Sequence, residues 1–193
     1  MPDEAEVLGL VALMLFSAAR RSARRDPAGG YVPLSEQDVT HWSLPLIGEA
    51  NALLRRAERQ AKPGRYQLEA AIQSLHCARA FTGKTDWPAI AWLYDGLAAL
   101  APSIGALVGR AAAIAEAQDA AAGWRALQAI PADLVETYQP YWATAAHLLA
   151  CLQQRAEARA AYARAIELAG DSAQRDFLRR KMTALGPAIG GGA

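Results

Sequence analysis

The spacing of small and aromatic residues over residues 142–170, WATAAHLLACLQQRAEARAAYARAIELAG, constrains the fold more than any other feature of the chain. Small Ala146 follows Trp142 by four residues, large Leu149 by seven, and aromatic Tyr162 by twenty. Small residues let two antiparallel helices approach closely, while aromatic residues fill the space towards the next helix pair. The stretch therefore predicts two antiparallel helices joined by a short turn.

This spacing matches the tetratricopeptide repeat pattern. Weaker copies start at Ile104 and at Ser74, where Trp124 and Tyr94 hold the position of the second aromatic residue. These aromatic residues could line a ligand-binding groove, but packing between helices is their more common role at helical spacing. Together the copies predict a right-handed array of antiparallel helical hairpins, and the concave surfaces of such arrays bind peptides or other protein segments.

The composition favours an all-α protein, because β-branched residues are sparse while Ala, Leu, Arg, Glu and Gln are abundant. Helix-start and helix-stop residues place two N-terminal helices and seven further ones. The expected ranges are 3–25, 45–61, 65–81, 87–100, 103–117, 120–129, 139–153, 155–168 and 172–185. Ser43, Asp86 and Ser103 are the expected caps of three of them.

The 193 residues are enough for one structural domain. We expect residues 1–62 to pack on the array or cap it, and residues 63–186 to form the tetratricopeptide-like repeats. Residues 187–193, PAIGGGA, have nothing to pack and are expected to form a disordered tail.

The formal net charge of +1 supplies no global field that would attract nucleic acid or an anionic membrane. We therefore expect no direct DNA binding. The apolar stretch VLGLVALMLF at residues 7–16 follows acidic residues and is too short to span a bilayer. A cytoplasmic protein is the expected outcome.

Residues that could carry catalysis or bind a metal are isolated in the sequence. His41, His76 and His147 form no HExxH motif, and Cys77 and Cys151 form no CxxC pair. We expect two buried thiols in a reducing compartment. Nucleotide-binding and hydrolase motifs are also missing, so we expect no cofactor, no metal and no enzyme, although an enzyme with an unrecognised site stays open.

Several stretches, in order and spacing, resemble the C-terminal extension of one group of extracytoplasmic-function sigma factors, a sigma-70 family of RNA polymerase subunits. The first stretches are DEAEVLGLVALMLFSAARRSAR, GGYVPLSEQDVTHW and LIGEANALLRRA, and the most specific ones are GRYQLEAAI and TDWPAIAWLYDGL. The chain departs from the family pattern at Val39 and His41, where that pattern has Arg. Nothing in it resembles the domain that melts the −10 element or the helix-turn-helix that reads the −35 element.

The resemblance implies a tetratricopeptide-like regulatory and protein-interaction domain that controls transcription initiation. Its implied partners are the sigma domains absent from this chain and the RNA polymerase core. A nearly neutral helical array without catalytic motifs suits protein contact. The alternative is a generic helical-repeat adaptor that binds peptides and has no part in transcription.

Ten residues in the resembling stretches are candidate interface or structural residues. Gln37 and Asp38 are expected to tie the long connection between the first two helices back to Arg20 or Arg24. For Gln37, Asp38, Gln67, Asp86 and Asp95 the alternative interpretation is helix capping and internal hydrogen bonding. Arg20 and Arg24 are alternatively partners of the helix dipole and salt-bridge donors. The candidates are Arg20, Arg24, Gln37, Asp38, Trp42, Gln67, Asp86, Trp87, Tyr94 and Asp95.

Overall fold

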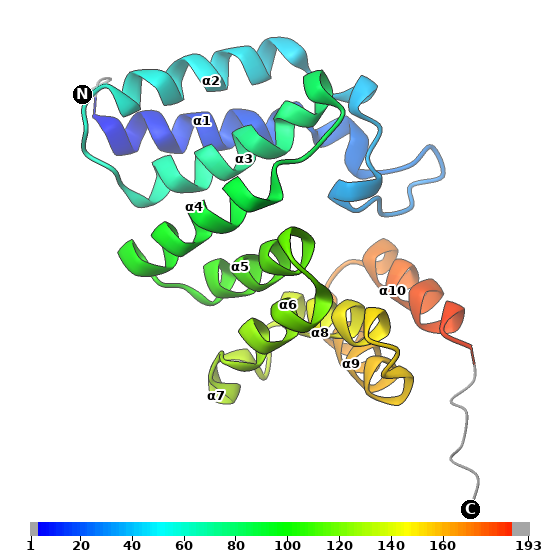
Figure 1. The fold of residues 1–193 in the computed structure, drawn as a ribbon. Coiled ribbons are helices and arrows are strands. Elements are labelled where there is room, and N and C mark those ends of the chain that lie inside the picture. The colour runs from blue at the N-terminus through cyan, green and yellow to red at the C-terminus, as the bar shows by residue number, and fades with distance from the viewer. Residues whose placement is uncertain (1–3, 187–193) are drawn as a thin grey trace, which may run out of the picture. The chain divides into compact units, whose positions relative to one another are not determined.

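The computed structural model describes residues 4–186, which form an all-α fold whose helices pack in neighbouring pairs (Figure 1). It assigns no β-strand to these residues. They group into two compact units, one of residues 4–28 and 32–102 and one of residues 29–31 and 103–186. The division falls after residue 102. The start of the first expected helix at Asp3 and the expected tail at 187–193 lie outside the described residues.

The first unit contains the four helices α1 to α4. α1 packs against both α2 and α3, and α3 also packs against α4. Ala12 and Phe16 of α1, Ile47 and Ala50 of α2, and Cys77 of α3 meet in one buried cluster, which forms the core of this unit. The helices are α1 (Ala5–Ala19), α2 (Leu44–Glu58), α3 (Arg65–Thr82) and α4 (Trp87–Leu100).

A glycine permits the close approach of α1 to the beginning of α3. A Cβ atom added at Gly9 would lie 2.7 Å from the backbone nitrogen of Gln67 and 2.9 Å from the carbonyl carbon of Tyr66. Real Cβ atoms do not approach backbone atoms that closely, so a residue without a side chain is required here.

The second unit contains helices α5 to α10. α5 and α6 form one antiparallel hairpin, α8 and α9 form another, and α10 packs on α9. Residues 29–31 belong to this unit, in which the Tyr31 ring lies edge-on to Phe177 with 5.4 Å between centroids. The helices are α5 (Ile104–Ala117), α6 (Ala120–Gln128), α7 (Ala132–Val135), α8 (Gln139–Cys151), α9 (Arg155–Leu168) and α10 (Ser172–Ala184).

The repeat positions counted from Trp142 are buried as expected. Ala146, Leu149, Ala158 and Tyr162 all belong to the core of the second unit. The copy that starts at Ser74 differs, because Phe81 is 64% exposed. Ala70 and Cys77 of α3 enter a core shared with α1 and α2. Phe81 lies on the same side of the helix, but it stands in the last turn before Thr82, past the residues that form that core.

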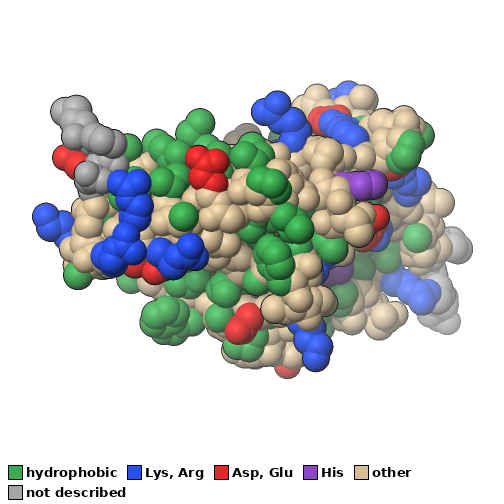
Figure 2. Space-filling view, turned by 90° about the horizontal axis from the view of Figure 1, so that it is seen from above, with side chains coloured by type: hydrophobic (Ala, Val, Ile, Leu, Met, Phe, Trp, Pro, Cys, Tyr) green, Lys and Arg blue, Asp and Glu red, His purple; other side chains and the backbone are tan. Residues whose placement is uncertain are grey.

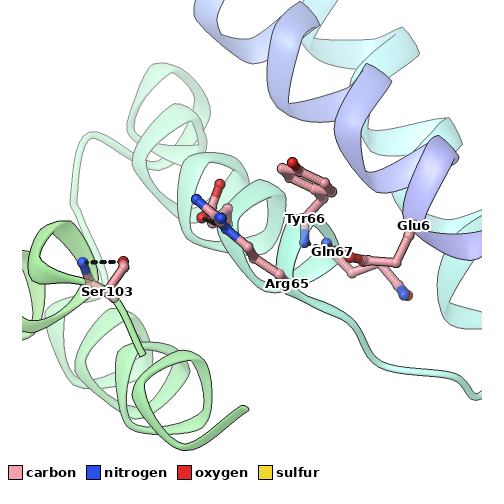
Figure 3. A network of polar contacts seen from close by, with 7 residues as sticks. Glu6, Arg65, Tyr66, Gln67 and Ser103 are labelled. Carbon is pink, nitrogen blue, oxygen red and sulfur yellow. Dashed lines mark hydrogen bonds and ion pairs between the residues drawn. The ribbon is translucent and has the colours of Figure 1, made fainter. Parts of the chain in front are cut away.

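Helix ends agree with the expected ranges to within a few residues, except at the first helix. α1 ends at Ala19 and is followed by a 3₁₀ turn over Arg21–Arg24. Asp86 and Ser103 cap α4 and α5 as expected, with the Ser103 hydroxyl accepting from the Ala106 N–H at 3.1 Å (Figure 3). Ser43 makes no side-chain cap hydrogen bond with the described residues of α2. Its backbone N–H donates to the Ala19 carbonyl at 2.9 Å.

The two cysteines differ in burial. Cys77 is fully buried, whereas Cys151 is exposed at the end of α8, so the expectation of two buried thiols is wrong for Cys151. The C-terminal turn of α8 leaves this position at the surface. None of the helices in residues 4–186 is long and apolar enough to cross a lipid bilayer.

Candidate functional site

The segment that leads into α2, residues 32–43, packs on α3 through the buried Trp42 and is hydrogen-bonded to that helix by one side chain. We call this segment the clamped loop. Arg79 of α3 donates from Nη1 to the Ser35 carbonyl and from Nη2 to the Leu34 and Gln37 carbonyls, each at 2.9 Å. The planar guanidinium fork can serve several acceptors at once. Arg79 thereby fixes the backbone of the loop from Leu34 to Gln37.

The clamped loop also places Trp42 beneath Arg79. The guanidinium carbon of Arg79 lies 5.1 Å from the centroid of the buried Trp42 ring, within cation–π range. Two buried polar atoms of the loop, Trp42 Nε1 and Gln37 Oε1, have no hydrogen-bond partner within residues 4–186. Buried polar groups without partners cost free energy, so the seated loop is less stable than a fully satisfied one.

Arg20, just beyond α1, is buried beside the same part of α3. Its Nε donates to the Phe16 carbonyl at 3.3 Å and its Nη2 donates to Gln73 Oε1. Burial lowers the pKa of Arg20, the Cys77 thiol acts in the opposite direction, and the charges of Arg24 and Arg79 lower it further. This guanidinium donates to a backbone carbonyl and a side-chain amide oxygen, whereas that of Arg79 donates to backbone carbonyls.

His76 connects α3 to α4 at this site. Its ring lies edge-on to Trp87, with 5.4 Å between centroids. Burial and then the charges of Arg20 and Arg79 lower the pKa of His76 to about 4, so the imidazole is neutral at pH 7. Burial raises the pKa of the adjacent Cys77 thiol, and a protonated thiol is a poor nucleophile. The Cys77 thiol is therefore protonated at pH 7.

Three of the residues singled out in the sequence come together here. Arg20, Trp42 and Trp87 contact Gln73, Arg79 and His76 respectively. Those three partners lie within two turns of α3, and we call them the α3 platform. The sequence reasoning missed Gln73 and Arg79, since only the packing of α1 and the clamped loop on α3 gives them a role.

The expectation that Gln37 and Asp38 bind Arg20 or Arg24 is wrong. Gln37 Nε2 donates to the Val32 carbonyl at 3.3 Å, within the clamped loop. Asp38 Oδ1 accepts from the backbone N–H and the hydroxyl of Thr40 at 2.9 and 2.8 Å, and these bonds lower the pKa of Asp38. The 3₁₀ turn that follows Asp38 offers these donors locally, so no distant arginine is needed.

Arg24 and Asp86 make their hydrogen bonds elsewhere. Arg24 Nη2 donates to the Ser17 carbonyl at 3.2 Å and to its hydroxyl at 2.7 Å, close to the end of α1. Asp86 accepts from the Ala89 N–H at 3.0 Å and caps α4. Tyr94 is partly buried and Asp95 is exposed.

Gln67 belongs to a second polar network, at the N-terminus of α3 (Figure 3). This helix starts after Gly64, which has no side chain to cap it, and Glu6 of α1 supplies the acceptors instead. Glu6 Oε2 accepts from the Tyr66 N–H and Oε1 from the Gln67 N–H, each at 3.2 Å. Gln67 Nε2 donates to the Lys62 carbonyl at 2.6 Å. The first residues of the GRYQLEAAI stretch therefore connect α3 to α1.

Part of this site lies in a region of the chain that matches a known protein family. Residues 1–58 match the model of a family of unknown function, DUF6596. An uncharacterized protein of Rhizobium meliloti (strain 1021) is 35% identical over 181 residues, which are 94% of this chain and 43% of that relative. The chain therefore spans less than half of the relative's length. No solved structure matches. Arg20 and the clamped loop lie within the matched residues, whereas the α3 platform lies beyond them.

Proposed function

We propose that this chain is the C-terminal regulatory domain of an extracytoplasmic-function sigma factor. It acts in the cytoplasm and controls transcription initiation through contacts with the sigma domains or with the RNA polymerase core. The proposal starts from the resemblance of the DEAEVLGL, GGYVPLSEQDVTHW, GRYQLEAAI and TDWPAIAWLYDGL stretches to such extensions. The relative from Rhizobium meliloti extends well beyond the matched part, which leaves room for further domains.

The observation that carries the proposal is the way the clamped loop is seated. One of the resembling stretches forms this loop, and Arg79 holds it through three backbone carbonyls. Removing the Arg79 side chain, or offering it other acceptors, would free the middle of the loop, while the ends stay tied by the Val32 N–H to the Arg24 carbonyl and by the Ser43 N–H to the Ala19 carbonyl. Trp42 Nε1 and Gln37 Oε1 lack partners in the seated state, so release also lets these two atoms form hydrogen bonds.

A loop with a seated and a released state gives the domain a physical basis for regulation. A partner that binds one state more tightly shifts the population towards that state, and only by its difference in affinity. The sigma domains, or the polymerase core, are the proposed partners. Protein contact agrees with the balanced charge of the chain, which favours neither DNA nor an anionic membrane.

The test is a calorimetric or fluorescence titration of the 193-residue chain against the sigma domains and against core polymerase, each produced separately. We expect micromolar or tighter association with one of them. Arg79→Ala should change that affinity about tenfold, because it alters the balance between the two loop states. The matched control is Arg65→Ala, which removes an arginine of the same helix whose ion pair with Glu69 is largely exposed.

Association with neither partner would contradict the proposal, as would a full-length gene that encodes no sigma domains beside this region. In the second case the helical-repeat adaptor becomes the better reading. Association that is insensitive to Arg79→Ala would leave the partner correct and rule out the clamped loop as the regulatory element.

A further inference from the structure

α1 exposes a continuous apolar stripe on the side that α2 and α3 leave uncovered. Val7 is 44% exposed, Val11 40% and Met14 62%, and Ala18 is also exposed. These residues follow each other at intervals of four, three and four, which places them on one face of the helix. In the view of Figure 2, hydrophobic side chains lie at the surface between charged ones. An unbroken stripe of this kind marks an interaction surface more often than scattered apolar residues do.

The two ends of the stripe carry opposite charges. Glu4 is exposed at the N-terminal end, and Arg21 is exposed just beyond the C-terminal end. Within residues 4–186, neither side chain has an ion-pair partner. The charges also match the polarity of the helix itself, whose dipole is positive at the N-terminus and negative at the C-terminus.

The stripe is symmetric about the midpoint between Ala12 and Leu13. Antiparallel pairing about this midpoint sets Val11 against the partner's Met14, Val7 against the partner's Ala18, and Glu4 against the partner's Arg21. The two helix dipoles would then point in opposite directions, so that the positive end of each helix lies beside the negative end of the other. Parallel pairing would instead bring Glu4 next to the partner's Glu4, so the charges select the antiparallel arrangement.

We propose that this stripe is the interface of a two-fold symmetric dimer of the chain, with the two α1 helices antiparallel. Each surface is its own complement, as a two-fold interface requires. One pair of 15-residue helices buries less than the ~1,200–2,000 Å² of a typical stable interface, so the dimer is weak, with a Kd on the order of 10 µM. This inference is independent of the proposed role in transcription.

The first test is sedimentation velocity of the 193-residue chain at concentrations from about 1 to about 300 µM, which span the expected Kd. Val11→Glu should raise the Kd at least about tenfold, because it brings two carboxylates into the centre of the interface. The side chain is exposed in the monomer, so the variant should remain folded. The matched control is Trp92→Glu, which places the same charge at a 72% exposed position on α4 and should leave the Kd unchanged.

A charge swap tests the register. Glu4→Arg alone and Arg21→Glu alone should each weaken the dimer, because each sets like charges opposite one another. The double variant should recover the original Kd, since the two ion pairs re-form with their charges exchanged. Both sites are exposed, so neither change should disturb the fold, and circular dichroism would verify this.

Three results would overturn the proposal. In the first, the chain stays monomeric up to the highest concentration, and the stripe then belongs to a different partner. In the second, Val11→Glu does not weaken the dimer. In the third, the double charge swap fails to recover association.

Discussion

Glu6 on α1 caps α3 at Gln67, a residue 61 positions later, by accepting its backbone N–H at 3.2 Å. The second carboxylate oxygen accepts the Tyr66 N–H at the same distance. The N-terminus of a helix carries unpaired N–H groups and partial positive charge, so a carboxylate is well suited to this position. The cap makes the start of α3 depend on tertiary packing, because Gly64 offers no local substitute.

We expect Glu6→Ala to lower the free energy of unfolding by about 1–2 kcal/mol, the usual range for a lost cap. Chemical denaturation followed by circular dichroism measures the change. Glu49→Ala, which removes an exposed carboxylate from α2, is the control and should stay within about 0.5 kcal/mol of the parent chain. Equal stabilities for the Glu6 variant and the parent would show that water replaces the carboxylate without cost.

Gly9→Ala should destabilise the first unit by about 2 kcal/mol or more, because the added methyl group would lie 2.7 Å from the Gln67 nitrogen. Backbone atoms on both sides leave little room for adjustment. Gly48→Ala is a matched control within a helix of the same unit, and there the new Cβ would meet no atom within 4 Å. That control should stabilise the chain by up to about 1 kcal/mol through helix propensity. A Gly9 variant as stable as the Gly48 variant would contradict the close contact.

Arg79→Lys should release the clamped loop although it keeps the charge. An ammonium group cannot reproduce a fork that reaches the carbonyls of Leu34, Ser35 and Gln37 together. We expect a loss of about 1–3 kcal/mol and faster amide hydrogen exchange in the loop, notably at Trp42, whose N–H donates to the Val39 carbonyl.

The control for that experiment is Arg65→Lys, which retains a cation beside Glu69 in an exposed ion pair. It should leave exchange in the clamped loop unchanged. Unaltered exchange in the Arg79 variant would mean that apolar packing alone keeps the loop in place.

His76 should make the stability depend on pH between about 6.5 and 4. The folded pKa is lowered to about 4 from an ordinary value of 6.5, so over this interval the unfolded chain binds a proton that the folded chain does not. Its stabilising contribution is therefore complete above pH 6.5 and is lost as the pH falls towards 4. The slope is at most about 1.4 kcal/mol per pH unit, or about 3 kcal/mol in all.

The measurement is the free energy of unfolding against pH for the parent chain and for His76→Phe. Phenylalanine keeps an aromatic ring against Trp87 and removes the titrating group. The difference between the two curves should therefore rise from pH 4 to 6.5 and then level off. Parallel curves would show that the folded protein accommodates the imidazolium.

The last hairpin of the second unit could be predicted from the sequence because its packing pattern involves residues close together in the chain. The small and aromatic residues counted from Trp142 act between helices that follow each other directly, and the buried positions of Ala146, Leu149 and Ala158 confirm them. Caps such as Asp86 and Ser103 also act within three residues of their own position. Local periodicity was less informative at Phe81, because it predicts the side of α3 on which the ring lies but not where along the helix the core ends.

Helix propensity and periodicity act over short distances, and they are enough to predict the all-α class, the position of most helices and the repeat spacing of the last hairpin. The contacts between distant segments could be found only in the folded chain: Glu6 caps α3, Arg79 and not Arg20 holds the clamped loop, and burial lowers the pKa of His76. Each of these depends on groups at least 40 residues apart in the chain or on the burial that their packing creates. No local pattern records such contacts, because many other residues could have supplied the same hydrogen bonds.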